Sequence, residues 1–532
     1  MKDTGRRISV LDVTLRDGGC VNDFNFGTDY MRGILSSLES SRVDYIELGY
    51  IDDKKGAKTG RTKYINEKVI PSALELVKKP GTVYLAMMDF GKFDPLCLSR
   101  CDGKGIDGIR LAFHKKDWNA AIDSGRIILE KGYKLFIQPM LTMHYSDDEM
   151  SELVERVNSM LPAASAFYLV DSFGEMRHDE LSRLVNIVDR SLNPDIALGL
   201  HSHNNLQLSY SLAMSLMRMP LQRRLFIDSS LMGMGKGAGN LCTELLIEQL
   251  NLYHGGDYEL RPVLEVIDRV IKVLHQETPW GYSVEYYLSS VNHCTPSYAS
   301  YFYNKHMLSI DQVSELLSML KEDKRISFDE GYANEVYLRY RADDAYDDSH
   351  VVAGLGNYIR GKKVLIIAPG MTAVTDRDKI LAEMSVGGLV SMELNSFDFN
   401  TDYKLITRPE LIERAVEKYR DQVVTTTRLA DGETSGAKVL NFRRWIESSG
   451  AANDSSAVIA INLLRYLGAE ELILAGFDGF SVDVNANYGD RKLRRPLTER
   501  RALACNSFFK DFLSRVSGTV RIRFLTASLY EV

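Results

Sequence analysis

Short apolar, β-rich runs recur through the first 230 residues, and each is followed by a stretch with helical periodicity, such as Asp147–Leu161. The last residues of successive runs are about 26 to 39 positions apart, the length of a strand–helix unit. Eight such units in about 250 residues are typical of a (β/α)₈ TIM barrel. An open doubly wound sheet is disfavoured because no GxGxxG follows the first run. The expected strands are Ile8–Asp12, Tyr45–Leu48, Val83–Met87, Gly108–Phe113, Lys134–Leu141, Ala166–Asp171, Ala197–His203 and Leu225–Ser230.

The pattern changes after the barrel. From about Leu260 to Leu320 it is mainly helical and rich in tyrosine, and Arg341–Ser349 is acidic and polar, as linkers are. Strand patterns at Lys363–Ala368 and Glu471–Ala475 then alternate with helices, which favours a second, Rossmann-like α/β domain. We predict four parts: a TIM-barrel catalytic domain (1–258), a helical extension (259–340), a linker (341–349) and a Rossmann-like domain of unknown role (350–532).

Composition places the chain among ordinary globular proteins. Its 532 residues are 45% hydrophobic and 26% charged, and the net charge of −7 gives no reason to expect a nucleic-acid or anionic-membrane partner. The longest apolar runs, such as Val364–Ala368, are far shorter than a membrane span, and the first residues show no secretory signal. The six cysteines form no CxxC pair. We therefore expect a cytoplasmic protein and leave a homo-oligomer open.

Polar residues at the ends of the barrel strands carry the candidate chemistry. His201 and His203 are two apart on one strand, so their imidazoles leave the same face. This pair alone is equally well explained by satisfied polar side chains. Asp17, after the first strand, would complete a site of two histidines and one carboxylate. Such a mixed nitrogen and oxygen set suits Mn²⁺, Mg²⁺, Co²⁺ or Zn²⁺ and leaves positions open for a substrate.

A glycine-rich segment, Gly233–Asn240, follows the last predicted barrel strand. It is either a close-packed turn or a loop that brings Asn240 and backbone N–H groups toward an anionic ligand. It does not match the P-loop pattern.

Four segments resemble the DRE-type metal-dependent barrel superfamily: LDVTLRDGG, YIELGY, GLHSHNN and DSSLMGMGKGAGNLCTELL. This superfamily includes 3-hydroxy-3-methylglutaryl-CoA (HMG-CoA) lyase, isopropylmalate and homocitrate synthases, and 4-hydroxy-2-oxovalerate aldolase. The match runs in order over roughly residues 7–250 and is most similar to the aldolase branch. The resemblance implies a lyase that uses a divalent metal, manganese first, to cleave or form a C–C bond. Its substrate would be a small 2-oxo acid, and it would act through a pyruvate-type enolate.

The resemblance also implies roles for individual residues. Arg16 would stabilise the charge of the enolate, and Glu47 would position charge beside it. The metal ligands would be Asp17, His201 and His203, with Asn240 as a further ligand.

Two positions depart from the aldolase pattern or leave it open. Cys20 stands where the aldolase branch has a histidine base, and a thiol, with an ordinary pKa near 8.5, would be a base only if shifted. We expect it to be a packing residue. Tyr286 lies in a GY…Y region where the aldolases bring a tyrosine to the substrate, but a packing role fits the many nearby tyrosines equally well.

Two other functions remain open. One is a Claisen-type acyl-CoA synthase or lyase, which would need a coenzyme A pocket. The other is a degenerate barrel that acts as a scaffold for a C-terminal domain binding a nucleotide or a sugar phosphate. In that domain, KVLIIAPG before a helix would place an anion at the helix N-terminus.

Overall fold

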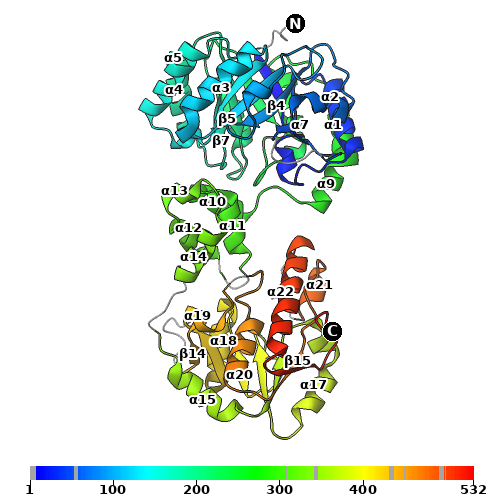
Figure 1. Cartoon of the computed structure of the whole chain (residues 1–532), viewed down its shortest axis with the longest axis vertical. Helices are drawn as coiled ribbons and strands as arrows, with labels where there is room; N and C mark the ends of the chain where they lie inside the picture. The colour runs from blue at the N-terminus through cyan, green and yellow to red at the C-terminus, as the bar shows by residue number, and fades with distance from the viewer. Residues whose placement is uncertain are drawn as a thin grey trace. The chain divides into compact units, whose positions relative to one another are not determined.

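The computed structural model describes residues 7–52, 58–305, 308, 310–340, 346–429, 436–448, 450–489, 497 and 499–531. They form two compact units, Met1–Pro296 and Ser297–Val532 (Figure 1). Residues 341–345 of the predicted linker lie outside the described residues. The division into four parts therefore stays a prediction. None of the described helices is both long and apolar enough to cross a membrane.

The first unit contains a parallel sheet that closes on itself. Strand β1 (Ile8–Asp12) pairs with β9 (Leu225–Ser229) on one side and with β2 (Tyr45–Ile51) on the other. The remaining barrel strands follow in chain order, and the short β3 adds to β2. The predicted (β/α)₈ barrel is confirmed. The other strands are β3 (Lys63–Tyr64), β4 (Val83–Asp89), β5 (Gly108–Phe113), β6 (Lys134–Pro139), β7 (Ala166–Asp171) and β8 (Ala197–Ser202).

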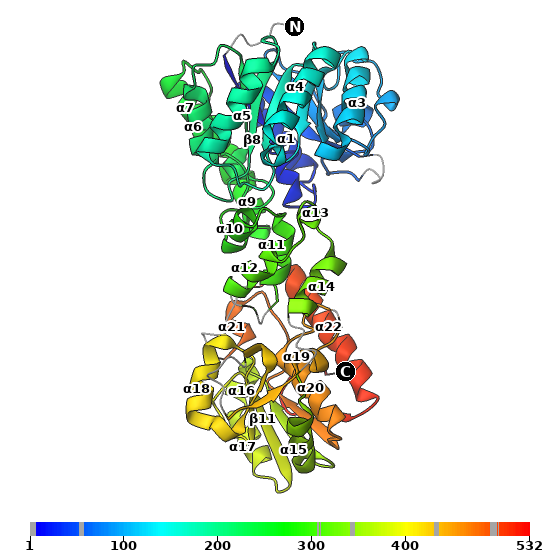
Figure 2. The ribbon, with the colours of Figure 1, turned by 90° about the vertical axis from the view of Figure 1, so that its left-hand side faces the viewer.

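Helices surround this barrel (Figures 1 and 2). Helix α4 illustrates why the sequence starts a helix where it does. The Ser146 hydroxyl accepts the N–H of Glu149 at 3.2 Å, and the Glu149 carboxylate accepts the N–H of Ser146 at 2.8 Å. This capping box satisfies N–H groups that have no partner within the helix. The helices of this unit are α1 (Thr28–Ser40), α2 (Ile70–Leu74), α3 (Trp118–Glu130), α4 (Asp147–Met160), α5 (His178–Ser191), α6 (Ser209–Arg218), α7 (Thr243–Tyr253), α8 (Leu260–Val266), α9 (Lys272–Glu277) and α10 (Val284–Val291).

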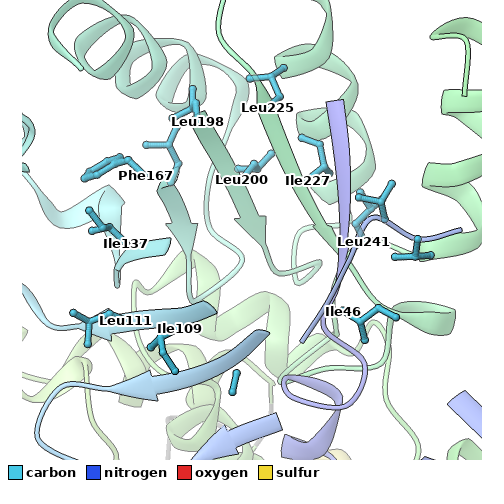
Figure 3. Packing of buried hydrophobic residues seen from close by; sticks show 14 of the residues in the cluster. Ile46, Ile109, Leu111, Ile137, Phe167, Leu198, Leu200, Leu225, Ile227 and Leu241 are labelled. Atoms are coloured by element: carbon cyan, nitrogen blue, oxygen red, sulfur yellow. The ribbon is translucent and has the colours of Figure 1, made fainter. Parts of the chain in front are cut away.

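Alternation along the strands gives the barrel two separate cores. Leu225 and Ile227 of β9 belong to the large cluster between strands and helices, whereas Phe226 belongs to a second cluster. Figure 3 shows part of the first cluster, with labelled side chains such as Leu198, Leu200 and Ile227 on successive strands of the barrel. In the second cluster the Phe226 ring packs edge-on against Tyr45 at 4.8 Å and Phe136 at 5.4 Å. The alternate side chains therefore fill the interior of the barrel and close its floor.

The second unit carries a seven-stranded sheet in the order β14-β13-β12-β11-β10-β15-β16, with every pair parallel. Helices lie on both sides of it (Figure 2). The predicted second, Rossmann-like α/β fold is confirmed. The strands are β10 (Lys363–Ile367), β11 (Leu389–Leu394), β12 (Tyr403–Leu405), β13 (Val423–Thr426), β14 (Lys438–Leu440), β15 (Glu471–Ala475) and β16 (Arg521–Phe524). The helices are α11 (Pro296–Tyr303), α12 (Ile310–Ser318), α13 (Glu322–Arg325), α14 (Glu330–Tyr340), α15 (Ser349–Ile359), α16 (Met371–Thr375), α17 (Arg377–Met384), α18 (Pro409–Tyr419), α19 (Phe442–Trp445), α20 (Ser456–Tyr466), α21 (Val484–Asn487) and α22 (Glu499–Ser517).

The loops after β10 and β15 approach each other closely. A Cβ on Gly370 would lie 2.2 Å from the carbonyl oxygen of Gly476, so only glycine fits there. The Asp478 carboxylate accepts the N–H of Thr372 at 2.9 Å and also the Thr372 hydroxyl, at the start of α16. The chain's own Asp478 carboxylate therefore engages these two donors at the start of α16.

Candidate metal centre and active site

Three of the predicted site residues meet at the carboxyl end of the barrel. One ligand atom each from Asp17, His201 and His203 lies within 4.8 Å of the others, and all three residues are buried. His201 is the penultimate residue of β8 and His203 follows the strand directly, and their ring centroids are 5.2 Å apart. Asp17 comes from the turn after β1. The ends of β8 and β1, which lie on either side of β9, thus produce the cluster.

A buried carboxylate orients His201. The imidazole Nδ1 lies 2.8 Å from Oδ2 of Asp228, and Arg110 donates to the same oxygen. Burial alone would raise the pKa of Asp228, but Arg110 and His201 outweigh it and lower that pKa. Because Nδ1 is engaged, Nε2 of His201 is the nitrogen left to coordinate a metal.

Asp17 is held as a carboxylate. Arg16 Nη1 donates to Oδ1 at 2.6 Å, and Asn240 Nδ2 donates to Oδ2 at 2.8 Å. Burial alone would raise the pKa of Asp17, but the charges of Arg16, His203 and His201 outweigh it and lower that pKa. The side chain is therefore in the state that a metal ligand requires.

Buried polar atoms without a partner show where a ligand fits. Nδ1 of His203, Oδ1 of Asn240 and Nη2 of Arg16 have no hydrogen-bond partner among the described residues. Burial lowers the pKa of His203 to about 4, so its imidazole keeps a free lone pair at neutral pH. Nδ1 of His203 lies 4.0 Å from Oδ2 of Asp17. Since unsatisfied buried polar atoms are rare, the donor set fits a divalent cation held by nitrogen and oxygen.

Arg16 is fixed on one side and open on the other. Glu47 of β2, fully buried, accepts Arg16 Nε at 2.7 Å and Arg110 Nη1 at 2.8 Å through the same oxygen. Burial alone would lower the pKa of Arg16, but Glu47 and Asp17 outweigh it and raise that pKa. The permanent positive charge of Arg16 therefore stands beside the cluster with Nη2 available to a ligand.

The glycine-rich loop brings the last members into place. A Cβ on Gly235 would lie 2.3 Å from Nδ2 of Asn240 and 2.6 Å from Oδ2 of Asp17. The N–H of Lys236 reaches the same Asp17 oxygen at 3.3 Å. The segment is thus a close-packed turn, and this packing is what presents Asn240 to Asp17.

Cys20 and Tyr286 lie apart from these contacts. Cys20 is exposed to solvent, and its role as a packing residue stays a prediction. Surrounding protein atoms and the negative charge of Asp17 nevertheless raise the pKa of its thiol to about 12. Tyr286 is half-buried on α10, which is fastened to the barrel by a 2.6 Å hydrogen bond from the Ser290 hydroxyl to the carbonyl of Phe173. The structure describes no hydrogen bond from the Tyr286 side chain to the cluster.

Arg110 and Asp228 are site residues that the sequence reasoning missed. Arg110 interrupts an otherwise apolar strand, and a charged residue there is almost never buried unless it is paired. That interruption was the available signal. Asp228 begins the segment DSSLMGMGKGAGNLCTELL, but the sequence did not mark it as the residue that orients His201.

Comparison with known proteins agrees with this geometry. Residues 119–266 match the HMGL-like family model. This match confirms the resemblance predicted from the four motifs, and the curated relatives that share it are named as aldolases.

The relatives are distant and cover about half of the chain. A 4-hydroxy-2-oxovalerate aldolase of Methylibium petroleiphilum is 26% identical over 295 residues, which is 53% of this chain and 82% of the relative. The enzyme of that name from Albidiferax ferrireducens is 27% identical over 250 residues, or 46% and 71% of the two chains. A solved N-terminal domain of a candidate aldolase from Bacteroides vulgatus has a TM-score of 0.50 and 23% identity, covering 58% of this chain and 99% of that one. This last likeness supports the fold.

Proposed function

We propose that the HMGL-like domain is a divalent-metal-dependent lyase that cleaves or forms a C–C bond at a small 2-oxo acid, as 4-hydroxy-2-oxovalerate aldolases do. The observation that carries the proposal is the buried cluster of Asp17, His201 and His203 beside the unpaired Nη2 of Arg16. A metal centre next to a fixed cation is what a reaction through an enolate needs. The aldolase relatives support the same reaction class.

The residues divide the work as follows. Asp17, His201 and His203 hold the metal, manganese first and magnesium, cobalt or zinc as alternatives, and Oδ1 of Asn240 is a further ligand. When bound, a divalent cation polarises substrate oxygens as a Lewis acid. Arg16 donates from Nη2 to the oxygen on which negative charge develops, and Glu47 holds the guanidinium in that orientation.

We expect a base other than Cys20. Surrounding protein atoms and the negative charge of Asp17 raise the pKa of this thiol, which disfavours it as the acceptor of a 4-hydroxyl proton. A water molecule or another side chain takes that role, and Tyr286 approaches the substrate from α10. We expect Cys20→Ala to retain its rate of aldol cleavage at pH 7.5, because it removes a group that does not transfer the proton.

Metal analysis combined with deuterium exchange into the methyl group of pyruvate tests the proposal. We expect the intact chain to contain bound divalent metal. We also expect it to exchange the methyl protons of pyruvate for deuterium, which NMR measures. His201→Ala/His203→Ala should lose both while it stays folded. His178→Ala/His254→Ala, which removes two exposed histidines of the same unit, is the matched control.

Two results would overturn the proposal. If His201→Ala/His203→Ala kept its full metal content and its full rate of deuterium exchange, the assignment of the metal site would be refuted. A metal-loaded protein that turns over a coenzyme A thioester, and exchanges no deuterium into pyruvate, would point to a Claisen-type enzyme instead.

A further inference from the structure

The second unit contains a pocket of its own, at the carboxyl ends of β10, β11, β12 and β15. It encloses about 780 Å³ between its walls, open space at the mouth included. The chain reverses its strand order between β10 and β15, because β10 pairs with β11 on one side and β15 on the other. In open parallel sheets this reversal leaves a crevice, and ligands bind there. The position alone therefore makes the pocket a candidate binding site.

One part of the lining is aromatic. The rings of Phe509 and Tyr530 are stacked, with centroids 5.5 Å apart and an interplanar angle of 25°. Phe480 adds a third ring 6.0 Å from Phe509, and Phe477 and Tyr488 also line the pocket. Such flat apolar surfaces accept a planar ring by offset stacking or edge contact. The pocket thus offers a place for the ring of a ligand.

A second part of the lining carries positive charge. Arg408 precedes α18, and only 6% of its side chain is exposed. Among the described residues its hydrogen-bond partner is Glu410, through a long contact of 3.5 Å to a carboxylate that is itself 48% exposed. Asp478 also lines the pocket, but Thr372 already engages both of its oxygens. A buried guanidinium with several donors left over is suited to a phosphate or a carboxylate.

The start of α20 adds donors to the same pocket. Ser455, Ser456 and Ala457 line it, and the Ser455 hydroxyl caps the helix by accepting the N–H of Val458 at 3.3 Å. The N–H groups of Ser456 and Ala457 lie in the first turn, where a helix provides no acceptor for them. The eleven-residue helix also directs the positive end of its dipole to this place.

We propose that this pocket binds a nucleotide. Its phosphate is held by Arg408 and the first turn of α20, and its base lies against the aromatic lining formed by Phe480, Phe509 and Tyr530. The combination of a flat apolar wall with a buried cation matches a ring joined to an anion. This site belongs to the second unit and is separate from the reaction proposed for the barrel.

Calorimetric titration of the full chain with nucleoside monophosphates, nucleoside diphosphates, free nucleosides and inorganic phosphate tests the proposal. We expect one nucleotide to bind more tightly than either its nucleoside or inorganic phosphate. Arg408→Gln should weaken nucleotide binding by about tenfold or more, because it removes a charge-assisted hydrogen bond. Phe480→Leu should weaken nucleotide binding and leave phosphate binding unchanged.

Arg414→Gln is the matched control, since Arg414 is exposed on α18 and does not line the pocket. It should bind the nucleotide as the unaltered chain does. The proposal is overturned if no nucleotide binds at millimolar concentration, or if Arg408→Gln and Phe480→Leu both bind it with unchanged affinity. Equal affinity for inorganic phosphate and for every nucleotide would also overturn it, because the ring would then contribute nothing.

Discussion

Arg16 uses two of its three guanidinium nitrogens to hold its own position. Nε and Nη1 donate to Glu47 and Asp17, while Nη2 is buried without a partner. Leaving a buried donor unsatisfied costs about 1–3 kcal/mol of folding stability, and the fold keeps Nη2 of Arg16 unpaired in spite of this cost. A group kept in this way is preorganised for charge that is absent in the free protein.

Arg16→Lys tests this preorganisation. A lysine keeps the charge but cannot hold two carboxylates and still direct a third donor at the ligand. We expect kcat for aldol cleavage and the rate of pyruvate exchange to fall by about 10²–10³, or roughly 3–4 kcal/mol. Metal content should persist, because Arg16 is not a ligand. Arg32→Lys, at a partly exposed pair with Glu75, is the control, and an unchanged exchange rate in Arg16→Lys would refute the role.

Asp12 links the stability of the barrel to pH. It is fully buried at the end of β1, where it accepts the N–H of Thr14 and the hydroxyl of Thr243. Burial is the largest effect and raises the pKa of Asp12 from 3.8 to about 6. The folded protein therefore binds this proton more tightly than the unfolded chain does. The contribution of Asp12 to the free energy of unfolding is fully present below about pH 4 and is lost as the pH rises through about 6.

Asp12→Asn should remove this pH-dependent loss of stability, because an asparagine side chain does not ionise. Because about two pKa units correspond to roughly 3 kcal/mol, we expect the variant to be more stable than the parent at pH 7.5, by up to that amount. The difference should shrink at pH 4.5. Urea unfolding of both chains at the two pH values measures it, with the exposed Asp102→Asn as control. A stability difference that does not change with pH would show that Asp12 titrates normally.

At the scale of elements, the apolar runs predicted the eight main barrel strands but only β10 and β15 of the second sheet. The pattern placed β5 and β7 at their observed bounds because one face of each strand packs on helices and the other fills the barrel. Two histidines on one strand were likewise predictable as a pair. The network behind them was not, because Arg110 meets partners 63 and 118 positions away in sequence. Such pairings depend on barrel closure, which no local pattern contains.

Arg110→Met tests whether this network supports the barrel. Arg110 is fully buried, and without it the buried carboxylates of Glu47 and Asp228 would keep only Arg16 and His201, respectively, as partners. Removing one partner of a buried pair typically costs about 3–5 kcal/mol, so we expect a clear fall in the unfolding midpoint. His201 should also lose its orientation, and metal affinity should fall with it. Arg126→Met, at an exposed pair on α3, is the control, and stability and metal affinity equal to the parent's would contradict the argument.

At the scale of the whole molecule, the helices after residue 296 belong with the second sheet. Lys305 donates to the side chain of Asn453 at 3.1 Å, and the hydroxyl of Tyr337 donates to Asp454. Arg501 of α22 donates to the carbonyl of Asn304. The sequence predicted a linker at 341–349 from its charge, but these contacts join the segments on either side of it. A composition pattern marks a chain segment without showing which parts pack together.

Limited proteolysis of the full chain tests whether the segments on either side of residues 341–349 stay associated after the chain between them is cut. Polar linkers are preferred cleavage sites, so we expect cuts in the predicted linker 341–349 that give fragments of about 340 and 180 residues. Because Lys305, Tyr337 and Arg501 bridge the cut, the fragments should elute together in size-exclusion chromatography and separate only in denaturant. Tyr337→Phe/Lys305→Ala should let them separate without denaturant. Fragments that separate at once in the unaltered protein would refute the bridge, and cuts concentrated inside the barrel would refute the linker.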